Sequence, residues 1–222
     1  MRYEKGHKEQ SRHRILEVAA ERFRNDGIAA SGLAGIMDEA GLTNGAFYPH
    51  FHSKAELVEE CLAKALQEQS KKLEQALAGG GLDAAIGLYL SKQHRDNPGL
   101  GCVFAALLPE LARQPDEARN RFAKLLQSSV REFASALPAP DSEAIALGLY
   151  ATLIGALQLA RATKDTALSD RILAAGARAA RVLGHQRPNK KRSGRTAKTR
   201  SKHKKPEAAD GERQIGKRNR SH

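Results

Sequence analysis

The sequence predicts an all-α fold, and three observations carry this prediction. Ala and Leu supply most of the apolar surface, while aromatic residues make up only 5% of the chain and Trp is absent, as expected for packed helices rather than a sheet. Apolar residues recur at helical spacing over residues 15–183, between short breaks that contain Gly or Pro. No segment shows the strict polar–apolar alternation of a half-buried strand.

Composition divides the chain into four segments. Residues 1–14 form a basic arm that could contact DNA, 15–53 carry short helices, 54–183 carry a larger helical body, and 184–222 are rich in Lys, Arg and Ser. The last segment holds 14 of the 37 basic residues and 3 of the 25 acidic ones, so residues 1–183 are nearly neutral despite the net charge of +12. With almost no apolar residues to bury, the basic 184–222 tail should be disordered when free.

The first helix is predicted from an apolar stripe with helical spacing that comprises Ile15, Leu16, Ala19 and Phe23. Gly27 follows this stripe as a candidate C-terminal cap. Two short helices are predicted next, at about 33–40 and 43–51, with Gly41 between them.

A long helix is predicted to begin after Ser53, because Ser53 followed by Glu56 has the spacing of a capping box. The helix should end at Gly79-Gly80-Gly81. Further helices are predicted at about 82–95, 102–113, 116–136, 142–163 and 167–183.

The stretch from Ser31 to Lys54 has the pattern of a helix-turn-helix, with a tight turn at Gly41-Leu42. A small apolar core would set the crossing angle of its helices, formed by Ile36, Ala40, Leu42, Phe47 and Phe51. The second helix would then project outward, as a helix does that enters the major groove of DNA. Its exposed side offers short polar groups, a methyl and a phenol, which suit base edges and phosphates, on Thr43, Asn44, Ala46, Tyr48 and His50.

The residues over roughly 11–62 resemble the tetracycline-repressor (TetR) family. The resemblance rests on Arg14-Ile15-Leu16, Ala19-Ala20, Phe23, Gly27, Ala40-Gly41-Leu42-Thr43-Asn44-Gly45 and Phe47-Tyr48-x-His50-Phe51-x-Ser53-Lys54-x-x-Leu57. It implies a three-helix DNA-binding domain, a larger helical domain that binds an effector and dimerises, and repression from a pseudo-palindromic operator. It also implies base contacts by Thr43, Asn44 and Ala46, and phosphate contacts by Ser31, Tyr48, His50 and Lys54.

Three residues depart from the family pattern. Gly32 and Gly35 flank and interrupt the first short helix, and each weakens it by up to ~1 kcal/mol. Pro49 falls in the predicted recognition helix, where a helical interior would be costly. Either that helix is so short that Pro49 lies in its last turn, or its end is distorted, and the contact of His50 is then less defined than those of the residues before it.

Small residues on the last two helices predict a homodimer. Stripes that would let a neighbouring helix approach closely are formed by Ala144, Gly148, Ala151 and Gly155, and by Ile172, Ala175, Gly176, Ala179 and Leu183. Two such helices from each protomer would make the four-helix bundle that the resemblance implies, and two recognition helices would face a two-fold operator. The alternative is that both stripes pack within one chain.

A cavity for a small-molecule or electrophilic effector is expected between the helices of the 54–183 body. Its candidate lining residues, each of which could instead be packing or surface, are Tyr89, His94, Phe104, Arg119, Phe122 and Gln158. Cys102 begins a predicted helix, where the helix N-terminus would stabilise a thiolate that senses electrophiles or oxidants. Alternatively Cys102 is a small core residue, as predicted for Cys61 on the apolar stripe of the long helix.

Other classes of protein are set aside on composition. Two cysteines are too few for a disulfide scaffold and indicate a reducing, cytoplasmic setting. No stretch approaches the roughly 18 uncharged apolar residues of a membrane span, and the first residues lack the apolar run of a secretory signal. We find no Gly-rich phosphate loop, metal-ligand spacing or nucleophile motif, so no enzyme activity, metal or cofactor is expected.

One rival to a repressor remains, a DNA-coating protein that binds through the basic tail by salt-sensitive neutralisation of phosphates. The tail could equally be a solvated extension without a role. Asn44→Ala separates repressor from coating protein, because it should abolish operator binding by the first and matter little to the second.

Overall fold

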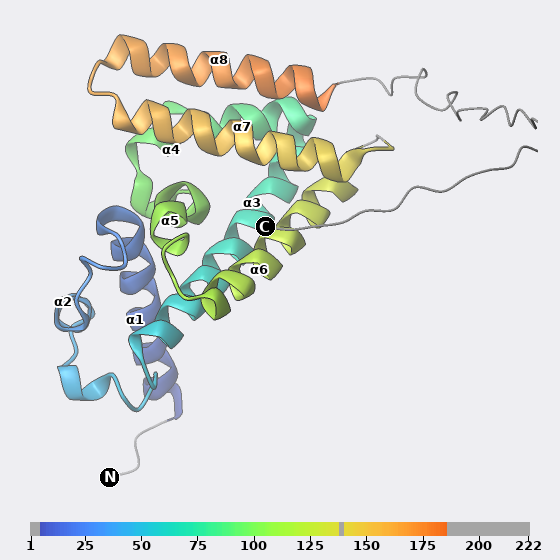
Figure 1. Cartoon of the computed structure of the whole chain (residues 1–222). Helices are drawn as coiled ribbons and strands as arrows, with labels where there is room; N and C mark the ends of the chain where they lie inside the picture. Colours follow the sequence, from blue (N-terminus) through green and yellow to red (C-terminus); the bar gives the residue numbers. More distant parts are fainter. Residues whose placement is uncertain (1–4, 138–139, 186–222) are drawn as a thin grey trace, which may run out of the picture. The chain divides into compact units, whose positions relative to one another are not determined.

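The computed structural model describes residues 5–137 and 140–185, and the all-α prediction is confirmed for this part of the chain (Figure 1). The described residues contain no β-strand. Their helices and 3₁₀-helices (η) are α1 Lys5–Asp26, α2 Leu33–Glu39, η1 Asn44–Ala46, α3 Lys54–Tyr89, α4 Lys92–Asp96, η2 Pro98–Leu100, α5 Val103–Leu111, α6 Asp116–Ser135, α7 Ser142–Ala162 and α8 Thr166–Gly184. From residue 186 on, the predicted disordered tail lies outside the described residues.

The predicted core of the helix-turn-helix is present between α1, α2 and η1. Ile36, Ala40, Phe47 and Phe51 are buried, and Leu42 is partly buried against them. The rings of Phe47 and Phe51 stack with their centroids 5.5 Å apart. Since burying one large apolar side chain contributes roughly 2 kcal/mol, this core is sufficient to hold the turn between α2 and α3 in place.

Two predicted elements differ in the structure. Residues 5–14 of the predicted basic arm are the first turns of α1, where Arg12 pairs with Glu60 of α3 and lies over the Phe51 ring at 4.8 Å. The recognition helix predicted over 43–51 is reduced to η1 followed by turns. Pro49 accounts for the shortening, because it lacks a backbone N–H and disfavours helical geometry at the residue before it.

The long helix α3 begins after the predicted N-cap Ser53 and bends within the predicted glycine run at 79–81. The Glu56 N–H donates to Ser53 Oγ at 3.1 Å, while the Glu56 carboxylate accepts from the N–H of His52 at 2.6 Å rather than from Ser53. At Gly80 and Gly81 the backbone leaves helical geometry, with φ of +66° at Gly81. Glycine tolerates this left-handed conformation, so α3 is kinked here and continues to Tyr89 in a new direction (Figure 1).

The body is built around α7, which packs against α6 and α8 (Figure 1). Contrary to the prediction, α7 is long and apolar enough to cross a membrane by length and composition. Its packing accounts for that composition on one face, where Leu149 and Leu157 are fully buried. Its other face exposes Leu147 and Leu159.

Two side chains connect α1 and the loop after it to the body. The Glu110 carboxylate of α5 accepts the backbone N–H bonds of Ile28 at 3.1 Å and Ala29 at 2.9 Å. Arg24 of α1 donates from Nε to the carbonyl of Gly99 in η2. These bonds join α5 and η2 directly to the C-terminal end of α1 and the loop after it.

Candidate DNA-binding surface and effector cavity

The turn between α2 and α3 exposes polar groups and is held from beneath by the buried rings of Phe47 and Phe51. Thr43 and Asn44 are exposed, Ala46 is half-buried, and the Tyr48 side chain is 69% exposed. The buried Phe47 ring lies edge-on to the Tyr48 ring, with centroids 5.5 Å apart. The turn thus holds a hydroxyl, an amide, a methyl and a phenol at the surface, the kinds of group that read base edges and phosphates.

Two of the predicted phosphate contacts face the protein. Ser31 is fully buried, and its hydroxyl donates to the carbonyl of Gly27 at 2.7 Å. The Lys54 ammonium donates to the Ile28 carbonyl and lies 6.0 Å from the Phe23 ring centroid. Both side chains hold the loop after α1 in place, so in this arrangement the Ser31 hydroxyl is not presented to DNA.

His50 lies at the edge of the same surface. It is half-buried, and its Nδ1 has no hydrogen-bond partner among the described residues. Burial lowers the pKa of His50, and the positive charges of Lys8 and Arg12 lower it further. These two cations belong to the N-terminal part of α1, which places positive charge beside the turn. The sequence offered no helical signal before residue 15 from which this placement could be predicted.

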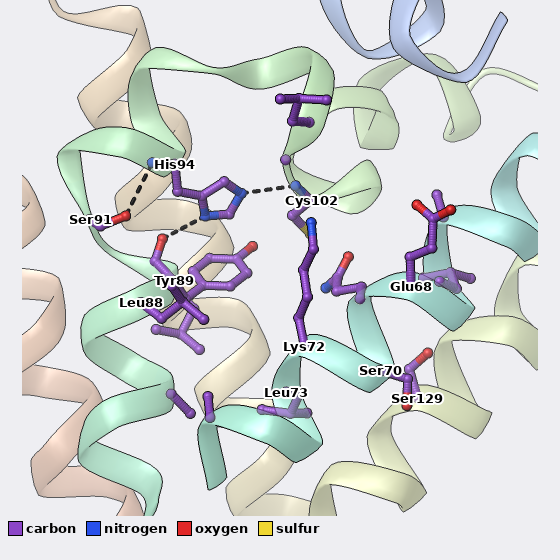
Figure 2. Close-up of a pocket in the computed structure, with 18 of the residues that line it drawn as sticks. Glu68, Ser70, Lys72, Leu73, Leu88, Tyr89, Ser91, His94, Cys102 and Ser129 are labelled. Atoms are coloured by element: carbon purple, nitrogen blue, oxygen red, sulfur yellow. Dashed lines mark hydrogen bonds between the residues drawn. The ribbon is translucent and has the colours of Figure 1, made fainter. Parts of the chain in front are cut away.

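The helical body contains a cavity of about 530 Å³ (Figure 2). Its lining comes from both halves of α3 and from α4, η2, α6 and α7, with Arg24 contributed by α1. Apolar side chains form much of it, including Leu66, Leu73, Ile86, Phe133 and Leu153. Cavities of roughly 300–1,000 Å³ are typical of small-molecule sites. The predicted effector cavity therefore has a physical counterpart in the body.

His94 organises one wall of the cavity through contacts to the backbone (Figure 2). Its Nδ1 donates to the Tyr89 carbonyl at 2.6 Å, and its Nε2 accepts from the Cys102 N–H at 2.9 Å. The Ser91 hydroxyl accepts from the His94 N–H at 3.1 Å. Because Nε2 is an acceptor, the imidazole is neutral, and burial lowers the pKa of His94 in agreement.

The predicted effector residues divide into two groups. Tyr89, His94 and Cys102 line the cavity. Phe104 is fully buried and lies edge-on to Phe122 at 5.4 Å, and neither is among the lining residues. The two rings instead pack α5 against α6.

The remaining candidates are also structural. Arg119 pairs with Asp116 at 3.2 Å on the surface of α6, and the Gln158 amide donates to the Ala105 carbonyl at 3.1 Å. Sequence patterns did not predict several polar lining residues, among them Gln69, Ser129 and Tyr150. A lone polar residue in an amphipathic helix carries no signal that separates a cavity wall from the surface.

The two thiols are both buried. Cys61 packs in the core as predicted, and burial raises its pKa to about 12. Cys102 is 2% exposed at the N-cap of α5 and borders the cavity. Its thiol is thus reached from the cavity rather than from the outer surface.

The predicted dimer residues of α7 form part of an apolar stripe. They are exposed or half-buried, comprising Ala144, Gly148, Ala151 and Gly155. The side chains of Leu147 and Leu159, 50% and 62% exposed, extend the stripe along the helix.

The predicted dimer residues of α8 are used in different ways. Gly176 serves a contact within the chain, since a Cβ there would lie 2.4 Å from the Cβ of Ala156 in α7. Ile172 packs partly against the core, whereas Ala179 is exposed. Gly176 therefore packs within its own chain, which was the stated alternative to a dimer contact.

Comparison with known proteins relates the N-terminal segment to one family. Residues 15–61 match the model of the bacterial regulatory proteins of the tetR family. The HTH-type transcriptional regulator TtgR of Pseudomonas putida is 40% identical over 113 residues, which cover 51% of this chain and 47% of TtgR. The HTH-type transcriptional repressor KstR2 of Mycolicibacterium smegmatis is 34% identical over 82 residues, which cover 36% of this chain and 40% of KstR2. The chain thus matches less than half the length of these relatives.

Solved structures extend the likeness to the fold of the body. A TetR-family transcriptional regulator from Agrobacterium tumefaciens has a TM-score of 0.65 at 21% identity, covering 78% of this chain and 98% of that chain. FadR from Bacillus subtilis, solved in complex with stearoyl-CoA, has a TM-score of 0.58 at 15% identity, covering 78% and 97%. The exposed turn on the core of α1, α2 and η1 has the arrangement of a helix-turn-helix. Residues 15–61 of this chain are thus similar to the DNA-binding segment of TetR-family regulators, and its fold is similar to that of TetR-family structures.

Proposed function

We propose that this protein is a transcriptional repressor that binds a pseudo-palindromic operator as a homodimer and is released by a small molecule in the body cavity. The observation that carries the proposal is the exposed turn from Thr43 to Tyr48, held on buried aromatic residues inside the segment that matches the TetR family. We expect the protein to act in the cytoplasm, where its DNA lies.

DNA recognition would use the turn in two ways. Thr43, Asn44 and Ala46 would face base edges, and the Asn44 amide offers the adjacent donor and acceptor that suit adenine. Tyr48 and His50 would contact phosphates, with Lys8 of α1 adding positive charge beside them. Lys54 and Ser31 would support these contacts from within the chain, since both the hydroxyl and the backbone N–H of Ser31 donate to the Gly27 carbonyl.

Dimerisation would use the apolar stripe of α7. A second copy would cover Leu147 and Leu159, and the small residues between them would let the two helices approach closely. A two-fold axis through this contact would set two turns toward the two half-sites of one operator. Ala179 of α8 is exposed and available to the same interface.

Release would depend on the contacts between body and helix-turn-helix. The residues at the end of η2 line the cavity, and the Gly99 carbonyl of η2 accepts the Arg24 bond. Glu110 of α5 holds the two backbone amides after α1. A ligand releases DNA if it binds more tightly to a body conformation in which these contacts displace the turn, since equal affinity for both conformations would release nothing.

The test is a binding titration of the full chain against the promoter DNA beside its own gene, with random DNA as competitor and at two salt concentrations. We expect sequence-selective binding, which Asn44→Ala weakens about 5- to 150-fold, the equivalent of ~1–3 kcal/mol for one bidentate base contact. Asn120→Ala, at an exposed position of α6, should bind as tightly as the wild type. Equal binding of promoter and random DNA, unaffected by Asn44→Ala, would establish the coating protein instead.

A further inference from the structure

We infer that residues 186–222 of the basic tail bind the phosphates of duplex DNA without regard to sequence, and that they supply most of the electrostatic attraction between this protein and DNA. These residues lie outside the described part of the chain. Their amino-acid sequence, together with the pairing of charges in the described part, carries this inference. That the bound DNA includes an operator rests on the proposed function, whereas the contact with phosphates does not.

The DNA-binding segment has no net charge of its own. Residues 5–53 contain six basic and six acidic residues. The most exposed side chains of the turn, Thr43, Asn44 and Tyr48, are uncharged. Such groups can read base edges. A surface of this kind lacks the positive charge that draws a protein to DNA and neutralises its phosphates.

Most cations near the turn are already used within the protein. Arg12 and Arg22 form ion pairs with carboxylates of α1, α2 and α3. Arg24 and Lys54 donate to backbone carbonyls. Among the side chains that the structure describes over residues 6–54, two exposed cations stand outside any ion pair, Lys8 and Arg14. The described DNA-binding surface therefore offers few cations to the phosphates.

The tail has the charge that this surface lacks. Residues 186–222 contain 14 of the 37 basic residues and 3 of the 25 acidic ones, a net charge of +11 out of +12 for the whole chain. Each phosphate that a Lys or Arg neutralises releases counterions and steepens the dependence of log affinity on log salt by roughly 0.9. Contact by even half of the tail cations would outweigh Lys8 and Arg14.

The composition of the tail favours phosphates over bases or a lipid bilayer. Residues 186–222 contain no aromatic residue that could stack on a base. Their one large aliphatic residue is Ile215, which is too little apolar surface to enter a membrane interface. Their cations include two clusters, Lys190-Lys191-Arg192 and Lys202-His203-Lys204-Lys205. Lys and Arg contact the phosphates of any base sequence, so the tail adds affinity without selectivity.

The tail is long enough to reach DNA held at the turn. The helix before it, α8, ends at Gly184, beside Leu82 in the part of α3 that follows the kink. The part of α3 before the kink, residues 54–79, begins directly after the DNA-binding segment and is roughly 40 Å long. Residues 186–222 can span at most roughly 130 Å. This reach exceeds the length of α3 severalfold, so DNA on either side of the turn lies within it.

The test changes four charges in the full-length protein. The tail variant carries Gln in place of Lys190, Lys191, Lys204 and Lys205. The control variant loses the same charge at exposed positions of the body, with Gln in place of Lys71, Arg113, Lys124 and Arg131. Binding of promoter DNA and of random duplex DNA of equal length is titrated at several salt concentrations between about 50 and 200 mM.

We expect the tail variant to bind both DNAs about tenfold or more weakly than the wild type at the lower salt concentrations. Its slope of log affinity against log salt should be shallower by about 2–4, since each lost phosphate contact removes roughly 0.9. Its preference for promoter over random DNA should be unchanged, because phosphate contacts carry no sequence information. The control variant should match the wild type in affinity and in slope.

Equal affinities and slopes for the tail and control variants would overturn the inference. A loss confined to promoter DNA would also overturn it, because contact without regard to sequence predicts the same loss on both DNAs. The proposed function fails separately. If the wild type shows no preference for promoter DNA but its salt slope depends on the tail, the inference holds and the repressor fails. If the wild type prefers promoter DNA with a slope that the tail does not change, the repressor holds and the inference fails.

Discussion

The backbone N–H of Cys102 donates to Nε2 of His94 at 2.9 Å, and this bond ties the start of α5 to the segment that follows α3. The opposite ring nitrogen of His94 donates to the Tyr89 carbonyl at 2.6 Å. Both bonds require a neutral ring protonated on Nδ1. A proton added to Nε2 would remove the acceptor for the Cys102 N–H.

This arrangement predicts a pH dependence of stability. Burial lowers the pKa of His94 in the folded protein, so the unfolded chain, with a pKa of about 6.5, binds the proton more readily. The contribution of His94 to the free energy of unfolding is therefore present above about pH 6.5 and is lost as the pH falls below it.

Urea denaturation between pH 7.5 and 5.5 checks this prediction. His94→Gln should be less stable than the wild type at pH 7.5 and should lose less of its stability on acidification. His13→Gln, at an exposed position of α1, should follow the wild-type pH dependence. Parallel curves for the wild type and His94→Gln would show that the imidazole does not titrate as described.

The Glu110 carboxylate is predicted to stabilise the junction between α5 and the loop after α1. It accepts two backbone N–H bonds, from Ile28 and Ala29, and hydrogen bonds to a charged group contribute about 1.5–3 kcal/mol. Glu110→Gln should lower the free energy of unfolding by about that amount, because its amide nitrogen meets an N–H donor. Glu117→Gln on α6, where the carboxylate contacts only the exposed Arg121, should cost ~1 kcal/mol or less. Equal effects of the two substitutions in chemical denaturation would contradict the role of Glu110.

The kink in α3 predicts opposite effects at two neighbouring glycines. Gly81 has φ of +66° and ψ of −161°, a conformation that essentially only glycine adopts, so Gly81→Ala should destabilise the protein by about 1–3 kcal/mol. Gly79 lies in the helical part of α3 with open space where a Cβ would be, so Gly79→Ala should be neutral or stabilise by up to ~1 kcal/mol. Thermal denaturation of the two variants measures this difference. A destabilised Gly79→Ala together with an unaffected Gly81→Ala would be incompatible with the kink.

The apolar stripe of α7 predicts how the oligomeric state responds to charge. Leu147→Glu and Leu159→Glu place a carboxylate on the exposed stripe, where an interface would have to desolvate it. We expect a dimer for the wild type and monomers for both variants in sedimentation equilibrium. Ala123→Glu, at an exposed position of α6, should remain dimeric. Dimers of unchanged stability in all three variants would place the interface elsewhere.

Local patterns were sufficient to predict the class of fold and most helix ends. Ser53 and the glycines at 79–81 act on the backbone within one or two turns, so the start and the kink of α3 could be predicted from the chain alone. The shortening of the recognition helix to η1 was among the outcomes expected from Pro49. The start of α1 was missed because residues 5–14 have almost no apolar stripe, and their helix is stabilised by contacts such as Arg12 with Glu60, 48 positions away.

By itself, the sequence determined the all-α class, the helix-turn-helix core and the exposed turn, because each depends on residues close together in the chain. The tertiary structure alone decided which polar residues share a cavity. Gln69, Tyr89 and Cys102 come together only because α3 bends at Gly81 and α4 leads back to the start of α5. It also turned the Ser31 hydroxyl inward and assigned Gly176 to packing within the chain. These outcomes depend on how distant helices pack, which periodicity along one helix does not specify.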